Sequence, residues 1–467
     1  MSTPRRAPRS ASIARPASSA RARRRSAGLL LVGVLAIAAC GSDDDATDDV
    51  AAASATTADD TDGSTSSATD SSATESASST GGATPVSLDG GAMSPDPADL
   101  PDPASFSGDR SSQVESATES WPTDWDRRTV GLDEFLVGIP TSDPRDVIRP
   151  IDEPVYEPIA AADWLDEREP GALVRFEGET RFYPLSIMTR HEIVNDVFGD
   201  VPVVVTYCPL CNTAVTFDRR VDGDVLRFGV SGLLRNSDLV MWDDATTSLW
   251  QQISGEGIVG DFDGTLLEII PTSIVSYGEV LENFPEAESL SRDLGFGIDY
   301  GLNPYTAYSS STQPFLFDGE PDPRFPALSR VVGVTIRDGD TDGDVHQAYP
   351  FDLIDDVRVV NDEVDGVPIV VFWGGDTADA LDTASIAEGQ AVGTGLAFDR
   401  RVGDQVLTFE SAGDDTFVDT ETQTTWSLLG VGTDGPLAGE QLETVPHRNE
   451  FWFAWSAFFP DADVWSP

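Results

Sequence analysis

An internal duplication limits the fold of this chain more than any other feature of its sequence. PLSIMTRHEIVNDVFGDVP, which begins at Pro184, is matched by PFDLIDDVRVVNDEVDGVP from Pro350, with Val-Asn-Asp in the same register. TFDRRVDGDVLRF at Thr216 is matched by AFDRRVGDQVLTF at Ala397, and further matched segments follow in the same order. Matched blocks in one order predict two tandem repeats of one β-rich topology. We expect them to pack with pseudo-two-fold symmetry.

The pattern inside each repeat predicts a strand-dominated α+β fold. An amphipathic helix should follow the first proline, because Ile187, Met188, Val194, Val197 and Phe198 fit a period of 3.6. A continuously apolar run at 203–207 then predicts a buried strand. Asp-Gly pairs after this strand predict tight hairpin turns.

Composition divides the chain into six parts. They are a signal peptide at 1–39, a disordered acidic Ser/Thr/Ala/Asp stalk at 40–115, an irregular lead-in at 116–167, a first repeat at 168–290, a connector at 291–327 and a second repeat at 328–467. The stalk has almost no large apolar residues, so it cannot bury enough surface to offset the entropy of ordering.

The N-terminus predicts export and a lipid anchor. A basic segment up to Arg25 precedes the short apolar run 28–39, which is typical of a secretory signal peptide. Small residues then lead into Cys40, and this ending resembles the lipobox of bacterial lipoproteins. The resemblance implies that Cys40 carries lipid and holds the protein at the outer face of the cell membrane. A transmembrane anchor is the alternative, but twelve apolar residues are too few to span a bilayer.

Charge excludes several classes of function. The chain has a formal net charge of −52 and contains no lysine. We therefore expect no nucleic acid partner, because phosphate contacts need a basic surface. Schiff-base chemistry needs a lysine amine and is excluded.

Two kinds of catalytic or binding motif are missing from the sequence. No phosphate-binding or dinucleotide glycine motif is present, which predicts no nucleotide cofactor. Ser231 lacks the nucleophile elbow of serine hydrolases.

Cys208 and Cys211 form a C-x-x-C pair directly after the predicted buried strand, in the first repeat only. Three interpretations remain open. A structural disulfide is the usual role in an exported protein, although so short a loop gains little from a cross-link. Thiol–disulfide exchange is the second, but the sequence after Cys211 predicts a strand where such motifs open a helix. The third is a copper or zinc site, since two thiolates with an imidazole suit either metal.

The other candidate site residues are polar groups that the fold could bring to these thiols. We expect His447 to be the third metal ligand, because it opens a block that should pack back across the first repeat, and His191 is the second choice. Four further residues should support the ligands: Glu192, Asn195, Asn236 and Asp238.

Several long motifs resemble one known family. YCPLCNTAVTFDRR, FGVSGLLRNSDLVMWDDATTSLWQQ, DYGLNPYTAY, VVFWGG and FWFAWSAFFPD, in this order, are similar to the bacterial and archaeal domain of unknown function 3179. The resemblance covers about residues 120–467 and implies no activity. Three kinds of function remain: a metal-binding lipoprotein, an extracytoplasmic thiol–disulfide oxidoreductase, and a non-catalytic ligand-binding surface lipoprotein. The sequence identifies no protein partner for any of them.

Overall fold

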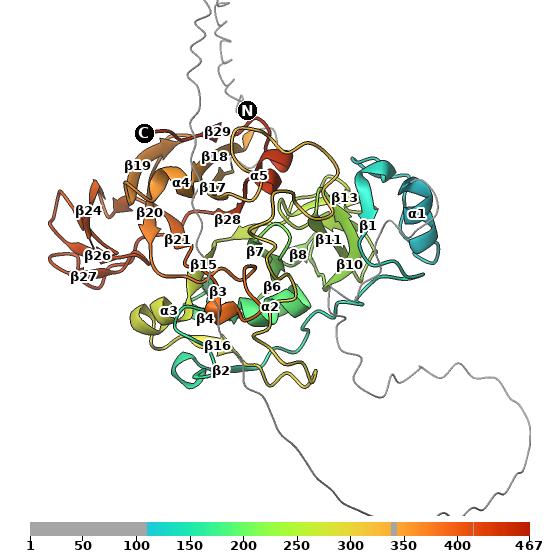
Figure 1. The fold of residues 1–467 in the computed structure, drawn as a ribbon, viewed down its shortest axis with the longest axis horizontal. Coiled ribbons are helices and arrows are strands. Elements are labelled where there is room, and N and C mark those ends of the chain that lie inside the picture. The colour runs from blue at the N-terminus through green and yellow to red at the C-terminus, as the bar shows by residue number, and fades with distance from the viewer. Residues whose placement is uncertain (1–109, 338–342, 414) are drawn as a thin grey trace, which may run out of the picture. The chain divides into compact units, whose positions relative to one another are not determined.

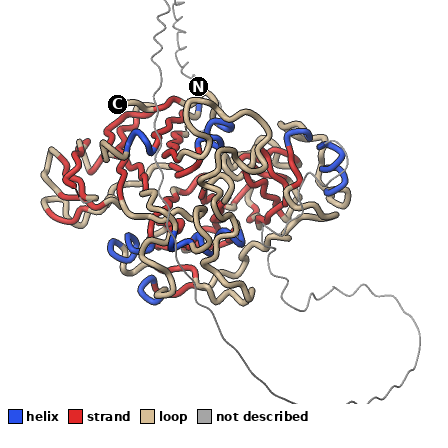
Figure 2. Tube along the Cα trace, in the orientation of Figure 1, coloured by secondary structure: helices blue, strands red, loops and turns tan. Residues whose placement is uncertain are grey.

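The computed structural model describes residues 110–337, 343–413 and 415–467. The signal peptide, Cys40 and nearly all of the predicted stalk lie outside the described residues. The described chain consists mostly of short antiparallel sheets joined by loops, with a few short helices (Figures 1 and 2). The predicted strand-dominated fold is confirmed. None of the helices within these ranges is long and apolar enough to span a bilayer.

The first half contains a central four-stranded sheet, two five-stranded sheets and the two-stranded pair β8-β9. Its elements are α1 Arg110–Ala117, β1 Phe135–Val137, β2 Tyr156–Pro158, β3 Pro170–Phe176, β4 Glu179–Pro184, α2 Leu185–His191, β5 Ile193–Phe198, β6 Val201–Cys208, β7 Thr213–Asp218, β8 Arg220–Val221, β9 Asp224–Val225, β10 Phe228–Arg235, β11 Asp238–Asp243, β12 Leu249–Gln251, β13 Glu256–Val259, β14 Ile269–Ile270, β15 Thr272–Ser276, α3 Tyr277–Asn283 and β16 Glu288–Leu290. The central sheet has the order β14-β7-β6-β5, and the five-stranded sheets are β1-β10-β11-β12-β13 and β15-β3-β4-β16-β2.

The second half repeats much of this element order. Its elements are β17 Arg330–Ile336, β18 Val345–Pro350, α4 Phe351–Ile354, β19 Val359–Val364, β20 Val367–Gly374, β21 Thr394–Asp399, β22 Arg401–Val402, β23 Gln405–Val406, β24 Phe409–Gly413, β25 Thr416–Asp419, β26 Thr425–Ser427, β27 Gly432–Asp434, β28 His447–Phe451, α5 Trp452–Phe458 and β29 Asp463–Val464. Its main sheets are β28-β17-β18-β29, β19-β20-β21 and β24-β25-β26-β27.

Residues shared by the two halves make the same contacts in each. The side chain of Asn195 donates to the carbonyl of Phe228 at 2.8 Å and accepts from its N–H at 3.0 Å. Asn361 makes the same pair of hydrogen bonds with Phe409, both at 2.9 Å. Asn195 therefore ties β5 to β10, and Asn361 ties β19 to β24 in the same way. Superposition of the two halves by a pseudo-two-fold axis stays a prediction.

The helix predicted after Pro184 is much shorter than its periodicity indicated. Glu192 adopts a left-handed conformation with φ of 60°, and its N–H caps the helix on the Met188 carbonyl. The chain then continues as β5, in which Val194 pairs with Val205 of β6. The prediction that the helix reached Phe198 is wrong, because both faces of β5 are largely buried and its apolar pattern imitates a helical one.

β6 is the buried strand that the sequence predicted. It lies between β5 and β7, and residues 202–208 are all buried. β28 of the second half pairs with β17 on one side, and Figure 1 shows it running toward β7 of the first half. A single apolar core includes Val204 of β6 together with Phe451 and Phe453. The second half thus packs on the β6–β7 hairpin that carries the cysteines.

Candidate metal centre

Both cysteines lie at the tip of the β6–β7 hairpin. Cys208 is the last residue of β6 and pairs with Thr213 of β7, so Cys211 lies in the turn between the two strands. Pro209 opens this turn, and Asn212 closes it in a left-handed conformation with φ of 53°, which asparagine tolerates better than most residues. Both thiols are buried and free, with no disulfide between them.

Segments distant in the sequence hold this turn in place. The Tyr308 hydroxyl, from the connector, donates to the Leu210 carbonyl at 2.9 Å. The N–H of Phe451, at the end of β28, donates to the Cys211 carbonyl at 3.0 Å. The cysteines are therefore fixed on a rigid hairpin by both the connector and the second half, which is the support that a metal or catalytic site requires.

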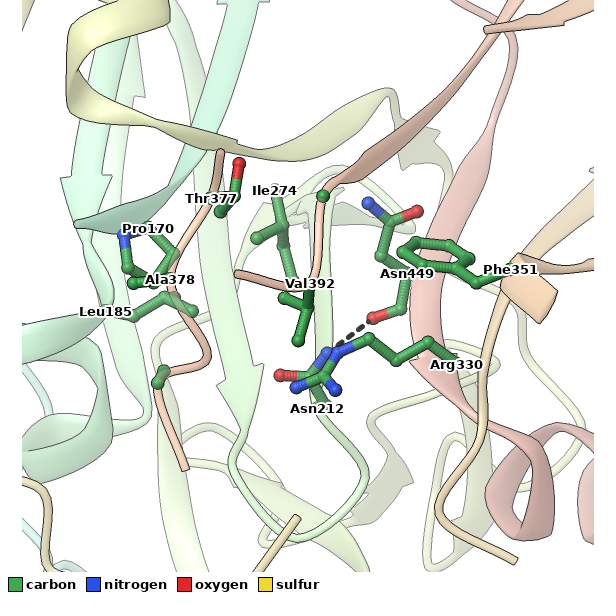
Figure 3. A pocket seen from close by; sticks show the side chains of 12 residues that line it. Pro170, Leu185, Asn212, Ile274, Arg330, Phe351, Thr377, Ala378, Val392 and Asn449 are labelled. Atoms are coloured by element: carbon green, nitrogen blue, oxygen red, sulfur yellow. Dashed lines mark hydrogen bonds between the residues drawn. The ribbon is translucent and has the colours of Figure 1, made fainter. Parts of the chain in front are cut away.

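A small cavity lies behind the turn (Figure 3). Asn212 Nδ2 donates to the Asn449 carbonyl at 3.0 Å on one wall of the cavity, and Arg330 lines the same space. Arg330 also donates to Asp379 at 2.8 Å. The cavity volume of about 20 Å³ matches a single water molecule rather than a substrate.

Asp238 joins the two cysteines in one cluster. A carboxylate oxygen of Asp238 and the sulfurs of Cys208 and Cys211 all lie within 4.8 Å of one another, and this is the one such group of three among the described residues. Asp238 Oδ2 accepts from Gln251 Nε2 at 2.6 Å and from the Ile253 N–H at 3.0 Å. Oδ1 is buried without a hydrogen-bond partner. The thiols of Cys211 and Cys208 lie close enough to this carboxylate to lower its pKa by hydrogen bonding, and a bound cation would satisfy Oδ1 more fully than a thiol does.

The β10–β11 turn presents this aspartate. Asn236 and Ser237 both adopt left-handed conformations, with φ of 50° and 65°, and Asp238 follows as the first residue of β11. The Cys208 thiol donates to the Ser237 carbonyl at 3.6 Å. The two hairpins β6–β7 and β10–β11 therefore meet tip to tip at the cluster.

Burial shifts the pKa of every ionisable group around the cluster. Desolvation raises the pKa of Asp238 to about 6 and that of Cys208 above its usual value. The Cys211 pKa lies higher still, because burial acts together with the neighbouring Cys208. Desolvation, assisted by the charge of Asp238, raises the pKa of Glu192 and of Glu450 to about 8, although Arg448 opposes the shift at Glu450. Without a bound cation, the site favours neutral thiols.

Neither His191 nor His447, the two histidines predicted as metal ligands, belongs to the cluster. His191 Nδ1 lies 2.7 Å from the Arg149 carbonyl, and its Nε2 lies 2.7 Å from the Tyr300 hydroxyl. His447 Nδ1 lies 2.8 Å from the Val445 carbonyl, and its Nε2 lies 3.4 Å from a serine hydroxyl. Both rings are occupied by hydrogen bonds elsewhere, so Asp238 takes the third position in their place.

Of the residues predicted to support the ligands, some lie beside the cluster and one does not. Glu192 is buried close enough to Asp238 for the charge of Asp238 to raise its pKa, and Asn236 forms part of the turn before Asp238. Asn195 instead bonds Asp152 at 2.8 Å and the β10 backbone, so it serves the fold. The sequence missed Glu450, a fully buried acid whose charge raises the pKa of Cys211. Its signal was an acidic residue directly before the aromatic run of the block that should pack back on the first repeat.

Among its described residues, the second half holds no counterpart of this cluster. Gly374 ends β20 where Cys208 ends β6. A Cβ atom added to Gly374 would lie 2.3 Å from Asp415 Oδ1, so a cysteine could not enter without movement of that aspartate. The thiol cluster is thus confined to the first half, as the sequence predicted.

The sequence profile of a family described as a protein of unknown function, DUF3179, matches residues 145–462. The chain belongs to the DUF3179 family. The match spans both halves and contains all three residues of the cluster. No curated protein matches the chain, and no solved structure matches it.

Proposed function

We propose that this DUF3179 protein binds one metal ion through Cys208, Cys211 and Asp238. The observation that carries the proposal is the unpartnered, buried Oδ1 of Asp238 beside two free thiols. A cation bound there would satisfy the orphaned oxygen and stabilise the thiolates, whose pKa values burial raises. Two sulfurs and a carboxylate oxygen at the tips of fixed hairpins form a compact set of donors.

We favour zinc over copper for this site. Cu(I) prefers thiolate and thioether ligands, whereas Zn²⁺ accepts sulfur and carboxylate oxygen together. Asp238 in place of a histidine or methionine therefore shifts the choice toward Zn²⁺. Thiol–disulfide exchange is the alternative. It is disfavoured because a reactive cysteine needs an exposed thiolate, while Cys208 and Cys211 are 2% and 0% exposed.

We further propose that the protein is exported and anchored by lipid on Cys40, and that its two halves arose by duplication. The lipobox-like sequence before Cys40 supports the first statement. The matched element order and the paired contacts of Asn195 and Asn361 support the second. On this account, the first half gained the thiols on a scaffold that both halves share.

Metal analysis of the purified chain tests the proposal. Protein made without an affinity tag, which could itself bind metal, should contain about one zinc per chain, as a single tetrahedral site requires. The Cys208→Ser and Cys211→Ser variants should lose it, while Cys40→Ser should keep it. Wild-type protein that carries no metal and takes up none, or that contains a Cys208–Cys211 disulfide instead, would overturn the proposal.

A further inference from the structure

We propose that Glu450 supplies the fourth donor to this metal, so that one ion links the two halves of the chain. The inference rests on the proposed metal site and extends it to a residue of the second half. Glu450 lies on β28, 239 positions after Cys211 in the sequence.

Three protein donors leave a tetrahedral zinc ion one ligand short. Closed sites take the fourth ligand from the protein, whereas open sites keep a water molecule there. The cluster is sealed, since Cys208 is 2% exposed and Cys211 and Asp238 are 0% exposed. A further protein side chain is therefore the natural fourth donor.

The backbone of β28 places Glu450 directly against the cysteine turn. Its two neighbours both bond this turn, Phe451 through its N–H to the Cys211 carbonyl and Asn449 through its carbonyl to the Asn212 side chain. Thr213 Oγ1 lies 3.3 Å from Glu450 Oε2, which positions the carboxyl group beside the hairpin.

Glu450 Oε1 is buried and has no hydrogen-bond partner, and the residue is 0% exposed. Its oxygens lie outside the 4.8 Å group formed by the other three donors. The side chain must therefore rotate inward to reach a bound ion. The contact with Thr213 that opposes this rotation is long for a hydroxyl donor, at 3.3 Å.

Glu192 is the rival for the fourth position, because it is also buried near Asp238. It is 7% exposed, whereas Glu450 is 0% exposed and its Oε1 has no hydrogen-bond partner. Glu450 therefore has the greater need of a ligand. Charge also favours Glu450, because the buried guanidinium of Arg448 projects from the same face of β28 and offsets the added negative charge.

Zinc affinity of the full-length, tag-free chain tests the inference by competition with a chelator. Glu450→Gln should weaken zinc binding by at least about tenfold. That is the smaller loss typical of replacing a residue that only supports a metal ligand, and Glu450 is proposed as a ligand itself. Glu169→Gln is the matched control, since Glu169 is likewise buried and has an unpartnered oxygen, Oε2, at a place away from the cluster. It should keep the wild-type affinity.

An unchanged affinity in Glu450→Gln would overturn the inference, and so would a loss confined to Glu192→Gln. A wild-type chain that binds no zinc would instead refute the metal site itself, so the two failures can be told apart.

A second measurement does not depend on the folding of a variant. Wild-type protein loaded with Co²⁺ should give the same electron paramagnetic resonance line width in ¹⁷O-labelled water as in ordinary water, because no water occupies the fourth coordination position. Broadening would place water on the metal and exclude Glu450 from it.

Discussion

Replacing Asp238 by asparagine should stabilise the metal-free protein and weaken its response to zinc. Burial raises the pKa of Asp238 from 3.8 to about 6, so its folded-state pKa lies above the unfolded value. The fold therefore loses stability as the pH rises through this window, by ~3 kcal/mol for a shift of about two pH units. Asparagine carries no charge, and its oxygen can still accept from Gln251 and Ile253. We expect a gain of about 1–3 kcal/mol at pH 7.

Zinc should reduce or cancel this advantage of the variant, because it stabilises wild type more. At free zinc one hundred times the dissociation constant, wild-type protein gains about 2.7 kcal/mol. A variant that binds tenfold to one hundredfold more weakly gains only about 0.4–1.4 kcal/mol at the same concentration. The assay is urea unfolding at pH 7, once with a chelator and once with zinc. Two results would refute the reasoning: a metal-free Asp238→Asn protein less stable than wild type, or an equal gain from zinc in both proteins.

The remaining predictions concern pH and anchoring. Between pH 6.5 and 8 the metal-free protein should lose stability as the pH rises, because burial raises the folded-state pKa of Glu192 and Glu450 to about 8. Each residue contributes up to ~2 kcal/mol of this loss over the interval. A free energy of unfolding, measured with urea, that stays constant or rises over the interval would contradict this. Cys40→Ser should move the protein from the membrane fraction to the soluble fraction, because the lipid is lost; membrane retention would argue against lipidation.

The sequence predicts the elements whose patterns are local. The continuous, β-branched apolar run of β6 favoured a buried strand, and the cysteines directly after it were expected at the end of a rigid element. The helix boundary was not predictable from periodicity, because a strand buried on both faces does not alternate. Only the left-handed conformation at Glu192 ends the helix before β5.

The site was predictable in part for the same reason. Cys208 and Cys211 are adjacent in sequence and could be recognised together. Asp238 was expected near them but ranked below the histidines, because the meeting of two hairpin tips depends on tertiary packing. Glu450 was missed although its block was expected to pack back on the first repeat, because only the register of β28 shows that Glu450 rather than His447 lies beside the cysteine turn. His447 opens that same strand, yet its ring nitrogens face Val445 and Ser273.

X-ray absorption at the zinc edge tests the central claim most directly, because it reports the atoms bound to the metal. Tag-free protein loaded with one equivalent of Zn²⁺ should show two sulfur neighbours at about 2.3 Å and oxygen neighbours at about 2.0–2.2 Å. In the Cys208→Ser,Cys211→Ser double variant the sulfur shell should disappear. A wild-type spectrum with nitrogen and oxygen neighbours only would contradict a site built on Cys208, Cys211 and Asp238.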